Sequence, residues 1–162
     1  MNMGRAVGFL LPFMLFGVLV SDTAAARDRV ERIAGWRVAS GGTGDGGRRV
    51  SLSRRGRGYD FEQYLEFWRG NGGVVIGASL RRGACRSGEA SAIVPTDQGL
   101  SRAMFDDRLA GYLRECPLPP AEAEVFRRTL DVAWPRFIAL AVRARAETEA
   151  ENEAIARHGE AD

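Results

Sequence analysis

Apolar and polar residues alternate along residues 59–68, and the predicted fold is organised around this stretch. With the period of a β-strand, one face is apolar and the other carries the charged residues. The apolar positions of this strand are Tyr59, Phe61, Leu65 and Phe67. The same stretch also fits an amphipathic helix, with Asp60 as its N-cap and Gly70 just past its end. Residues 59–68 therefore fit both a strand and a helix.

The residues that follow favour the strand. The pair 71–72 is Asn-Gly, which is typical of a two-residue hairpin because both central positions of a type I′ turn need positive φ. With that loop, Phe67 pairs with Ile76 on a mostly apolar face. On the other face Glu62 pairs with Arg81, which joins opposite charges. We therefore expect a β-hairpin here, with the helix as the alternative.

Shorter strand patterns lie on both sides of this hairpin. Residues 35–40 and 49–53 each predict a strand, and the glycine-rich residues 41–47 predict a flexible connection between them. The connection matches G-x-G-x-x-G, but a strand rather than a helix follows, so we interpret it as a loop. Beyond the hairpin, residues 84–89 predict a loop and residues 91–94 a short extended segment.

The second half of the chain has the period of helices. Residues 97–115 carry an apolar stripe that ends at Cys116, and residues 119–147 carry a second stripe that continues through Pro135. We expect one helix over each range, the second bent at the proline rather than divided. Residues 148–162 are polar, and we expect them to continue the helix and to fray into a disordered end.

A run of strands followed by helices predicts an α+β fold. We expect an antiparallel meander of three to five strands between residues 35 and 94, with two helices packed on one of its faces. Residues 27–147 would form this single domain, and residues 148–162 its polar tail.

The first residues predict export. Arg5, the apolar run 6–20 and the alanines 24–26 match the three regions of a signal peptide, with cleavage after Ala26. An uncleaved membrane anchor is the alternative, although the apolar run is shorter than the roughly 20 residues that a span needs. We therefore expect a periplasmic or secreted bacterial protein with no membrane span after cleavage.

The chain contains 2 cysteines, Cys85 and Cys116. In an exported protein such a pair predicts a disulfide. Closing this loop would contribute on the order of 3 kcal/mol to stability in the chain-entropy model. Because the spacing is not C-x-x-C, we expect a structural rather than a catalytic bridge.

Composition excludes several kinds of active site. The only histidine, His158, lies in the polar tail, and all 23 basic residues are arginine. Nucleophilic schemes that depend on a histidine or lysine base therefore have no base in the predicted core. The usual protein ligands of zinc and haem are not available either, so we expect no metal and no cofactor. Only carboxylate chemistry is left.

Charge is unevenly distributed. Residues 27–96 contain 13 arginines and 7 acidic residues, whereas residues 97–162 contain 9 arginines and 13 acidic residues. The arginines of the first half could bind polyanions, or they could form a solvated rim that discourages edge pairing. Nucleic acid is not an expected partner of an exported protein. The candidate binding arginines are Arg48, Arg49, Arg54, Arg55, Arg57, Arg81 and Arg82, with Arg86 beside them.

Acidic and aromatic residues interleave between Asp60 and Trp68, as they do in many sugar-binding sites. On a strand, Glu62 and Glu66 would lie about 13 Å apart, too far for paired catalysis. On a helix they would approach to about 6 Å, and Asp60 and Glu62 on a strand would lie at roughly 6.6 Å.

We therefore expect an exported envelope protein that binds an envelope polymer or a protein and is not an enzyme. Its binding surface would combine the arginines with the face that carries Glu62, Tyr64, Glu66 and Trp68. A glycan hydrolase that uses Asp60, Glu62 or Glu66 is the alternative. The sequence gives no indication of the oligomeric state.

Overall fold

The computed structural model describes residues 28–68 and 73–159. Within these ranges, six strands form one antiparallel sheet whose strand order is the chain order, and three helices follow. The elements are β1 Arg29–Ile33, β2 Trp36–Gly42, β3 Arg48–Gly56, β4 Tyr59–Phe67, β5 Gly73–Arg82, β6 Cys85–Pro95, α1 Thr96–Gly99, α2 Arg102–Glu115 and α3 Pro120–Gly159. The predicted signal peptide and the Asn-Gly turn lie outside the described residues.

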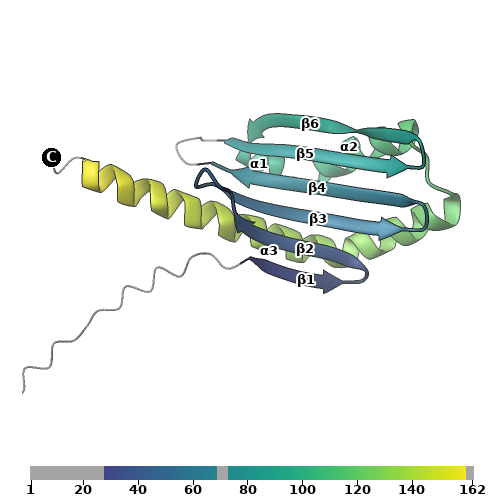
Figure 1. The fold of residues 1–162 in the computed structure, drawn as a ribbon, viewed down its shortest axis with the longest axis horizontal. Coiled ribbons are helices and arrows are strands. Elements are labelled where there is room, and N and C mark those ends of the chain that lie inside the picture. The colour runs from purple at the N-terminus through teal and green to yellow at the C-terminus, as the bar shows by residue number, and fades with distance from the viewer. Residues whose placement is uncertain (1–27, 69–72, 160–162) are drawn as a thin grey trace, which may run out of the picture.

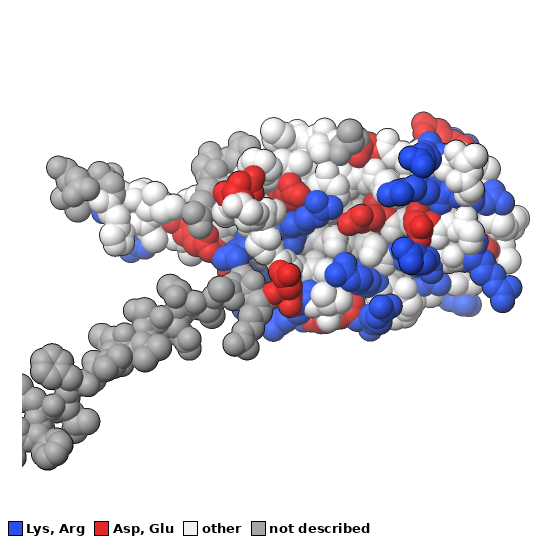
Figure 2. Space-filling view, in the orientation of Figure 1, with Lys and Arg blue, Asp and Glu red and all other residues white. Residues whose placement is uncertain are grey.

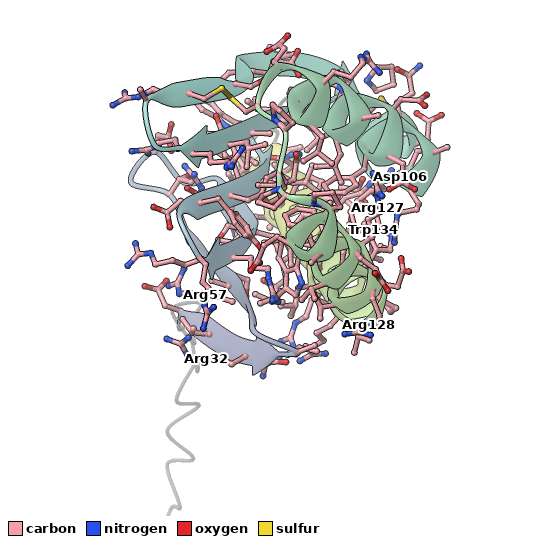
Figure 3. The ribbon with its side chains drawn as sticks, turned by 90° about the vertical axis from the view of Figure 1, so that its right-hand side faces the viewer. Arg32, Arg57, Asp106, Arg127, Arg128 and Trp134 are labelled. Carbon is pink, nitrogen blue, oxygen red and sulfur yellow. A yellow bond between two sulfur atoms is a disulfide. The ribbon has the colours of Figure 1, made fainter. Side chains whose placement is uncertain are left out.

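The domain has two layers, a sheet and a layer of helices on one of its faces (Figures 1 and 3). Helix α3 packs across β2 and β3, α2 lies against β6, and α1 contacts β5 and β6. The predicted α+β fold with an antiparallel meander and helices on one face is confirmed. None of the helices that the structure describes covers the other face of the sheet (Figure 1).

Alternation along β4 sorts its side chains between the two faces. Tyr59, Phe61, Leu65 and Phe67 are each at most 3% exposed and lie in the core between the sheet and the helices. The even-numbered side chains between them point to the open side, as expected for a strand buried on one face. The strand prediction for this stretch is therefore confirmed, and the helix alternative is wrong.

The predicted pairing across the hairpin is wrong by two residues. Ile76 pairs with Leu65, not with Phe67, and Arg81 pairs with Asp60, not with Glu62. The strands end at Phe67 and resume at Gly73, so the connection is longer than two residues. Because the shift is even, every side chain still points to the predicted face.

The strand count is also corrected, since six strands exceed the predicted three to five. The strand β1 was not predicted, and the segment 85–89, interpreted as a loop, forms the first half of β6. Both segments place polar side chains on the helix side, which hides the alternation. Glu31 in β1 pairs with Arg136 of α3, and in β6 Ser87 and Glu89 bond to side chains of α2. The helices supply the partners that make these partly buried or buried polar positions tolerable.

The predicted helix over 97–115 is divided into α1 and α2. Ser101 separates them and acts as the N-cap of α2, its hydroxyl accepting a hydrogen bond from the Met104 N–H at 3.4 Å. Serine is a favoured N-cap because its oxygen satisfies one of the otherwise unpaired N–H groups of the first turn. The chain therefore restarts its helix at Arg102.

Helix α3 is one continuous helix that includes Pro135, as predicted. It extends beyond residue 147 to Gly159, and Thr148 is only 3% exposed. The first turn of the polar segment thus still packs against the domain. Fraying of its end stays a prediction.

Aromatic rings join the helices to the sheet. Phe126 of α3 is fully buried, and its ring centroid lies 4.9 Å from that of Trp36 and 5.2 Å from that of Phe61. The Trp36 indole N–H also donates to the Thr129 hydroxyl at 3.0 Å. The indole is therefore both packed and hydrogen-bonded, which suits a buried tryptophan.

The predicted disulfide between Cys85 and Cys116 is confirmed, with the two Cα atoms 5.8 Å apart. It links the start of β6 to the end of α2 and is visible as the yellow bond in Figure 3. Among the described residues, no helix has the length and apolar character needed to cross a membrane.

Candidate binding surface on the open face of the sheet

The open face is the side of the sheet that carries no helix, and Figure 2 views it directly. Its side chains come from alternate positions of every strand and are largely charged. The principal members are Val30, Arg32, Arg37, Arg49, Arg55, Asp60, Glu62, Tyr64, Glu66, Val75, Ser79, Arg81, Arg86 and Ile93.

Strand alternation divides the predicted arginines into two groups. Arg48, Arg54 and Arg82 are even-numbered positions that point to the helix side, where protein groups bind them. Arg48 pairs with two glutamates of α3, and Arg82 donates to the carbonyl of Pro117. Arg54 donates to the Tyr59 hydroxyl at 3.0 Å and to a carbonyl of the β1–β2 turn. These three arginines support the fold and do not belong to the open face.

The odd-numbered arginines remain on the open side. Arg49 and Arg55 of β3 and Arg81 of β5 belong to the open face, and Arg57 lies exposed in the turn between β3 and β4. Arg55 forms an ion pair with Asp60 at 2.8 Å, with its own side chain 86% exposed. A pair this exposed contributes little to stability.

A connected cluster occupies the middle of the open face. The Arg49 guanidinium bonds to Glu66 at 3.0 Å and to Glu62 at 3.4 Å, and its Cζ lies 3.9 Å from the centre of the Tyr64 ring. The second carboxylate oxygen of Glu66 accepts the Trp68 indole N–H at 3.2 Å. The four predicted binding residues Glu62, Tyr64, Glu66 and Trp68 therefore do lie together, held by one arginine.

A bulge in β6 fixes the position of Tyr64 in this cluster. The pairing of β5 with β6 shifts between Ile76 and Ala78, so that β6 contains one extra residue. Beyond the shift, Ser91 lies on the open side and its hydroxyl is 2.8 Å from that of Tyr64. Gly77 lies beneath the Tyr64 ring, and a Cβ there would come within 2.3 Å of it. The glycine and the bulge together allow the ring to lie flat on the sheet.

This geometry does not favour the hydrolase alternative. Glu62 and Glu66 share one guanidinium, and Asp60 is paired with Arg55. A catalytic pair of carboxyl groups must be available to the scissile bond of a sugar, whereas these carboxylates are bonded to arginines of the sheet. Carboxylate catalysis stays an untested prediction.

Arginines gather at one end of the open face, where β1, β3 and β5 end. Figure 2 shows this concentration of blue side chains on the right-hand part of the face. We call this surface the arginine end. Its members are Arg32, Arg37, Arg55, Arg57, Arg81 and Arg86. In the described part of the chain, the strand pairing places the carboxylates Asp60 and Glu62 among these six arginines.

Most of these arginines have no anionic partner among the described residues. Within residues 28–68 and 73–159, Arg32, Arg37, Arg57, Arg81 and Arg86 form no ion pair, in contrast to Arg49 and Arg55. In Figure 3, which views the molecule from the arginine end, Arg32 and Arg57 lie on the sheet side, across from Arg128 on the helix side.

Two members of the arginine end, Arg32 and Arg37, were not among the predicted site residues. Arg32 was missed because β1 was not predicted. Arg37 could have been found, because it lies between the fully buried Trp36 and Val38 and must point away from the core. The same alternation would have separated Arg48, Arg54 and Arg82 from the open-face group.

Two shallow hollows cross the arginine end. One, of about 520 Å³, is lined by residues of β1 to β5 that include Arg32, Arg37 and Arg81. The other, of about 450 Å³, lies toward β6 and is lined by Arg86 together with Glu89, which pairs with Arg108, and Glu115, which bonds to Ser87. Glu62 and Ser79 line both hollows, so together they form one track across the strands.

The opposite end of the open face is less charged. Ile93 is 66% exposed and Trp68 41% exposed there. The described part of the chain contains no group of three or more histidine, cysteine or acidic side chains that could hold a metal ion.

Comparisons of this chain with protein-family models, with curated proteins and with solved structures found no match.

Proposed function

We propose that this protein is an exported bacterial envelope protein that acts by binding, and that the arginine end of its open face binds an anionic envelope polymer. The observation that carries the proposal is a set of exposed arginines, including Arg37 and Arg81, that have no ion-pair partner in the described residues. Planar guanidinium groups bind carboxylates and phosphates through two parallel hydrogen bonds.

Three features support a binding role. The sheet is rigid, because its other face is buried against the helices and the disulfide ties β6 to α2. A backbone held in this way limits the ordering cost of binding to that of the arginine side chains. The carboxylates nearest to the arginines are already engaged by Arg49 and Arg55. The predicted signal peptide adds the envelope location.

The experiment is co-sedimentation of the protein with protease-treated envelope preparations, which retain polymers but lose proteins. We expect binding that weakens steeply with salt, because counterions compete for the arginines. The double variant Arg37→Glu with Arg81→Glu should reduce the bound fraction at least about tenfold, since each reversal turns attraction into repulsion.

The matched control is Arg127→Glu with Arg128→Glu, which makes the same change of net charge on an exposed part of α3. We expect this control to bind like the wild type. Equal loss in both double variants would mean that net charge alone drives binding. No loss in the Arg37 and Arg81 variant would exclude the arginine end as the binding surface.

A further inference from the structure

We infer that the arginine end contains two separate anion subsites that bind one extended acidic glycan whose charged groups are spaced apart by neutral sugars. This inference rests on the proposed function and specifies the class of ligand. It starts from two pairs of arginines that face each other directly across neighbouring strands, Arg32 with Arg37 and Arg81 with Arg86.

All four side chains point to the open side, because their chain neighbours are held on the helix side. Arg37 lies between two fully buried residues of β2. Arg32 lies between Glu31, which pairs with α3, and Ile33, which packs against the core. Arg86 lies between the disulfide cysteine Cys85 and Ser87, which bonds to α2. The sheet therefore keeps both arginines of a pair on the open side, next to each other.

Like charges directly opposite each other destabilise an antiparallel pair. No carboxylate of the described residues forms an ion pair with any of these four guanidiniums. An anion bound between the two members of a pair would convert this repulsion into two attractive contacts. Each pair is therefore a preformed subsite for one carboxylate or phosphate group.

The distance between the subsites follows from the sheet. One subsite lies on β1 and β2 and the other on β5 and β6, so β3 and β4 run between them. At about 4.8 Å per strand, Arg37 and Arg81 lie roughly 14 Å apart across the sheet, and the centres of the two pairs roughly 19 Å apart. Small monovalent anions cannot reach both subsites.

The surface between the subsites determines what can connect the two anions. The track of the two hollows runs from Arg37 past Ser53, Glu62 and Ser79 toward Arg86. Two serine hydroxyls offer hydrogen bonds to sugar hydroxyls, whereas Asp60 and Glu62 are each paired with an arginine and add no net positive charge over the centre. A chain with anions at its two contact points and neutral, hydroxyl-rich units between them fits this surface. A chain with an anion on every unit would place charges over β3 and β4, where the arginines that line the track are already bonded.

The test is calorimetric titration of the natural protein with hyaluronan oligosaccharides of increasing length. Carboxylate-bearing sugars alternate with neutral sugars along hyaluronan. We expect affinity to rise by roughly 100-fold once the oligosaccharide is long enough to reach both subsites, because the second contact becomes intramolecular. Arg37→Gln and Arg81→Gln should each abolish this rise in affinity with length and leave the weak binding of short oligosaccharides to the remaining subsite. Arg127→Gln, which removes the same charge from α3, should retain the rise in affinity with length.

Polygalacturonate tests the spacing, because it carries a carboxylate on every sugar. We expect it to bind more weakly than hyaluronan of equal length. The variant Glu62→Gln should reduce this difference in affinity between the two polymers. Equal or tighter binding of polygalacturonate to the wild type would overturn the inference. A mannan oligosaccharide with spaced phosphates, titrated in the same way, identifies phosphate as the preferred group if it binds more tightly than hyaluronan.

The outcomes separate this inference from the proposed function. If Arg37→Gln weakens short and long oligosaccharides by the same factor, the open face binds anions but the two-subsite inference is wrong. If no probe binds in a way that depends on Arg37 or Arg81, both fail.

A second measurement needs no ligand. We expect Arg37→Gln and Arg86→Gln each to raise the melting temperature at low salt, because each removes one member of a like-charged pair. The rise should disappear at high salt, where the repulsion is screened. A lowered melting temperature at low salt would show that these arginines stabilise the fold and would contradict the subsites.

Discussion

The two faces of the sheet use arginine in opposite ways. On the helix side, Arg48, Arg54 and Arg82 each reach a protein acceptor and hold the sheet to the helices or turns. On the open side, Arg37 and Arg81 have no anionic partner among the described residues. The same strands supply both groups, so alternation along the chain separates a structural role from a surface that can accept a ligand.

The largest effect is expected in the core between sheet and helices. Phe126→Ala should lower the free energy of unfolding by about 3–5 kcal/mol, because it removes the buried ring that contacts Trp36 and Phe61. Urea denaturation measures this loss. Val132→Ala on the same helix, where the side chain is 58% exposed, should change stability by less than about 0.5 kcal/mol. Similar losses in the two variants would contradict the burial of Phe126.

The disulfide is expected to have the next largest effect. Replacing Cys85 and Cys116 together by alanine should lower the free energy of unfolding by about 2–4 kcal/mol, because the unfolded chain gains the freedom of an open loop. Denaturation of the wild type with and without reductant should give a similar loss, and reductant should not affect the variant. If reductant also lowered the stability of the variant, its effect on the wild type would not come from this disulfide.

Arg48 and Arg55 compare the two faces directly, because both belong to β3. Arg48→Ala should lower the free energy of unfolding by about 1–2 kcal/mol, since its side chain is 18% exposed and pairs with Glu147 and Glu151. Arg55→Ala should change it by less than about 0.5 kcal/mol, because its ion pair with Asp60 is exposed. Thermal unfolding of both variants measures the difference. A larger loss for Arg55→Ala would reverse the assignment of the two faces.

The smallest effect concerns acid stability at the edge strand β1. The hydrogen bond from Arg136 holds the pKa of the Glu31 carboxyl below its ordinary value of 4.5. A lowered pKa in the folded state means that the ion pair stabilises the protein above pH 4.5 and that this contribution is lost as pH falls through the lowered pKa.

Glu31→Gln should therefore melt at a lower temperature than the wild type at neutral pH, and the difference should shrink in acid. Melting temperatures measured across this pH range give the result. Arg136→Gln should behave in the same way because it removes the other partner. A difference that is independent of pH would show that the charge of Glu31 does not matter.

The strand faces could be predicted from the sequence because alternation is local. Phe61 and Leu65 had to share one face whatever the partner strand was, so even a pairing error of two residues left their burial correct. The strand count could not be predicted. Glu31 and Glu89 occupy the helix side of β1 and β6, and their partners Arg136 and Arg108 make these partly buried positions compatible with a charged side chain.

The candidate site was predicted in composition but not in arrangement. The cluster of Glu62, Tyr64, Glu66 and Trp68 was expected to share a face and does, but Arg49 engages both glutamates. The opposed arginine pairs depend on strand register, and the sequence contains no signal for the pairing of Arg81 with Arg86 or of Arg32 with Arg37.

The α+β class, the two faces of β4 and the pairing of the two cysteines follow from the amino-acid sequence alone, because periodicity is local and two cysteines allow one pairing. The packing of the helices on the sheet determines which arginines bond within the protein and which remain on the open face. The guanidinium of Arg48, for example, is bonded because packing brings Glu151 to it from far along the chain.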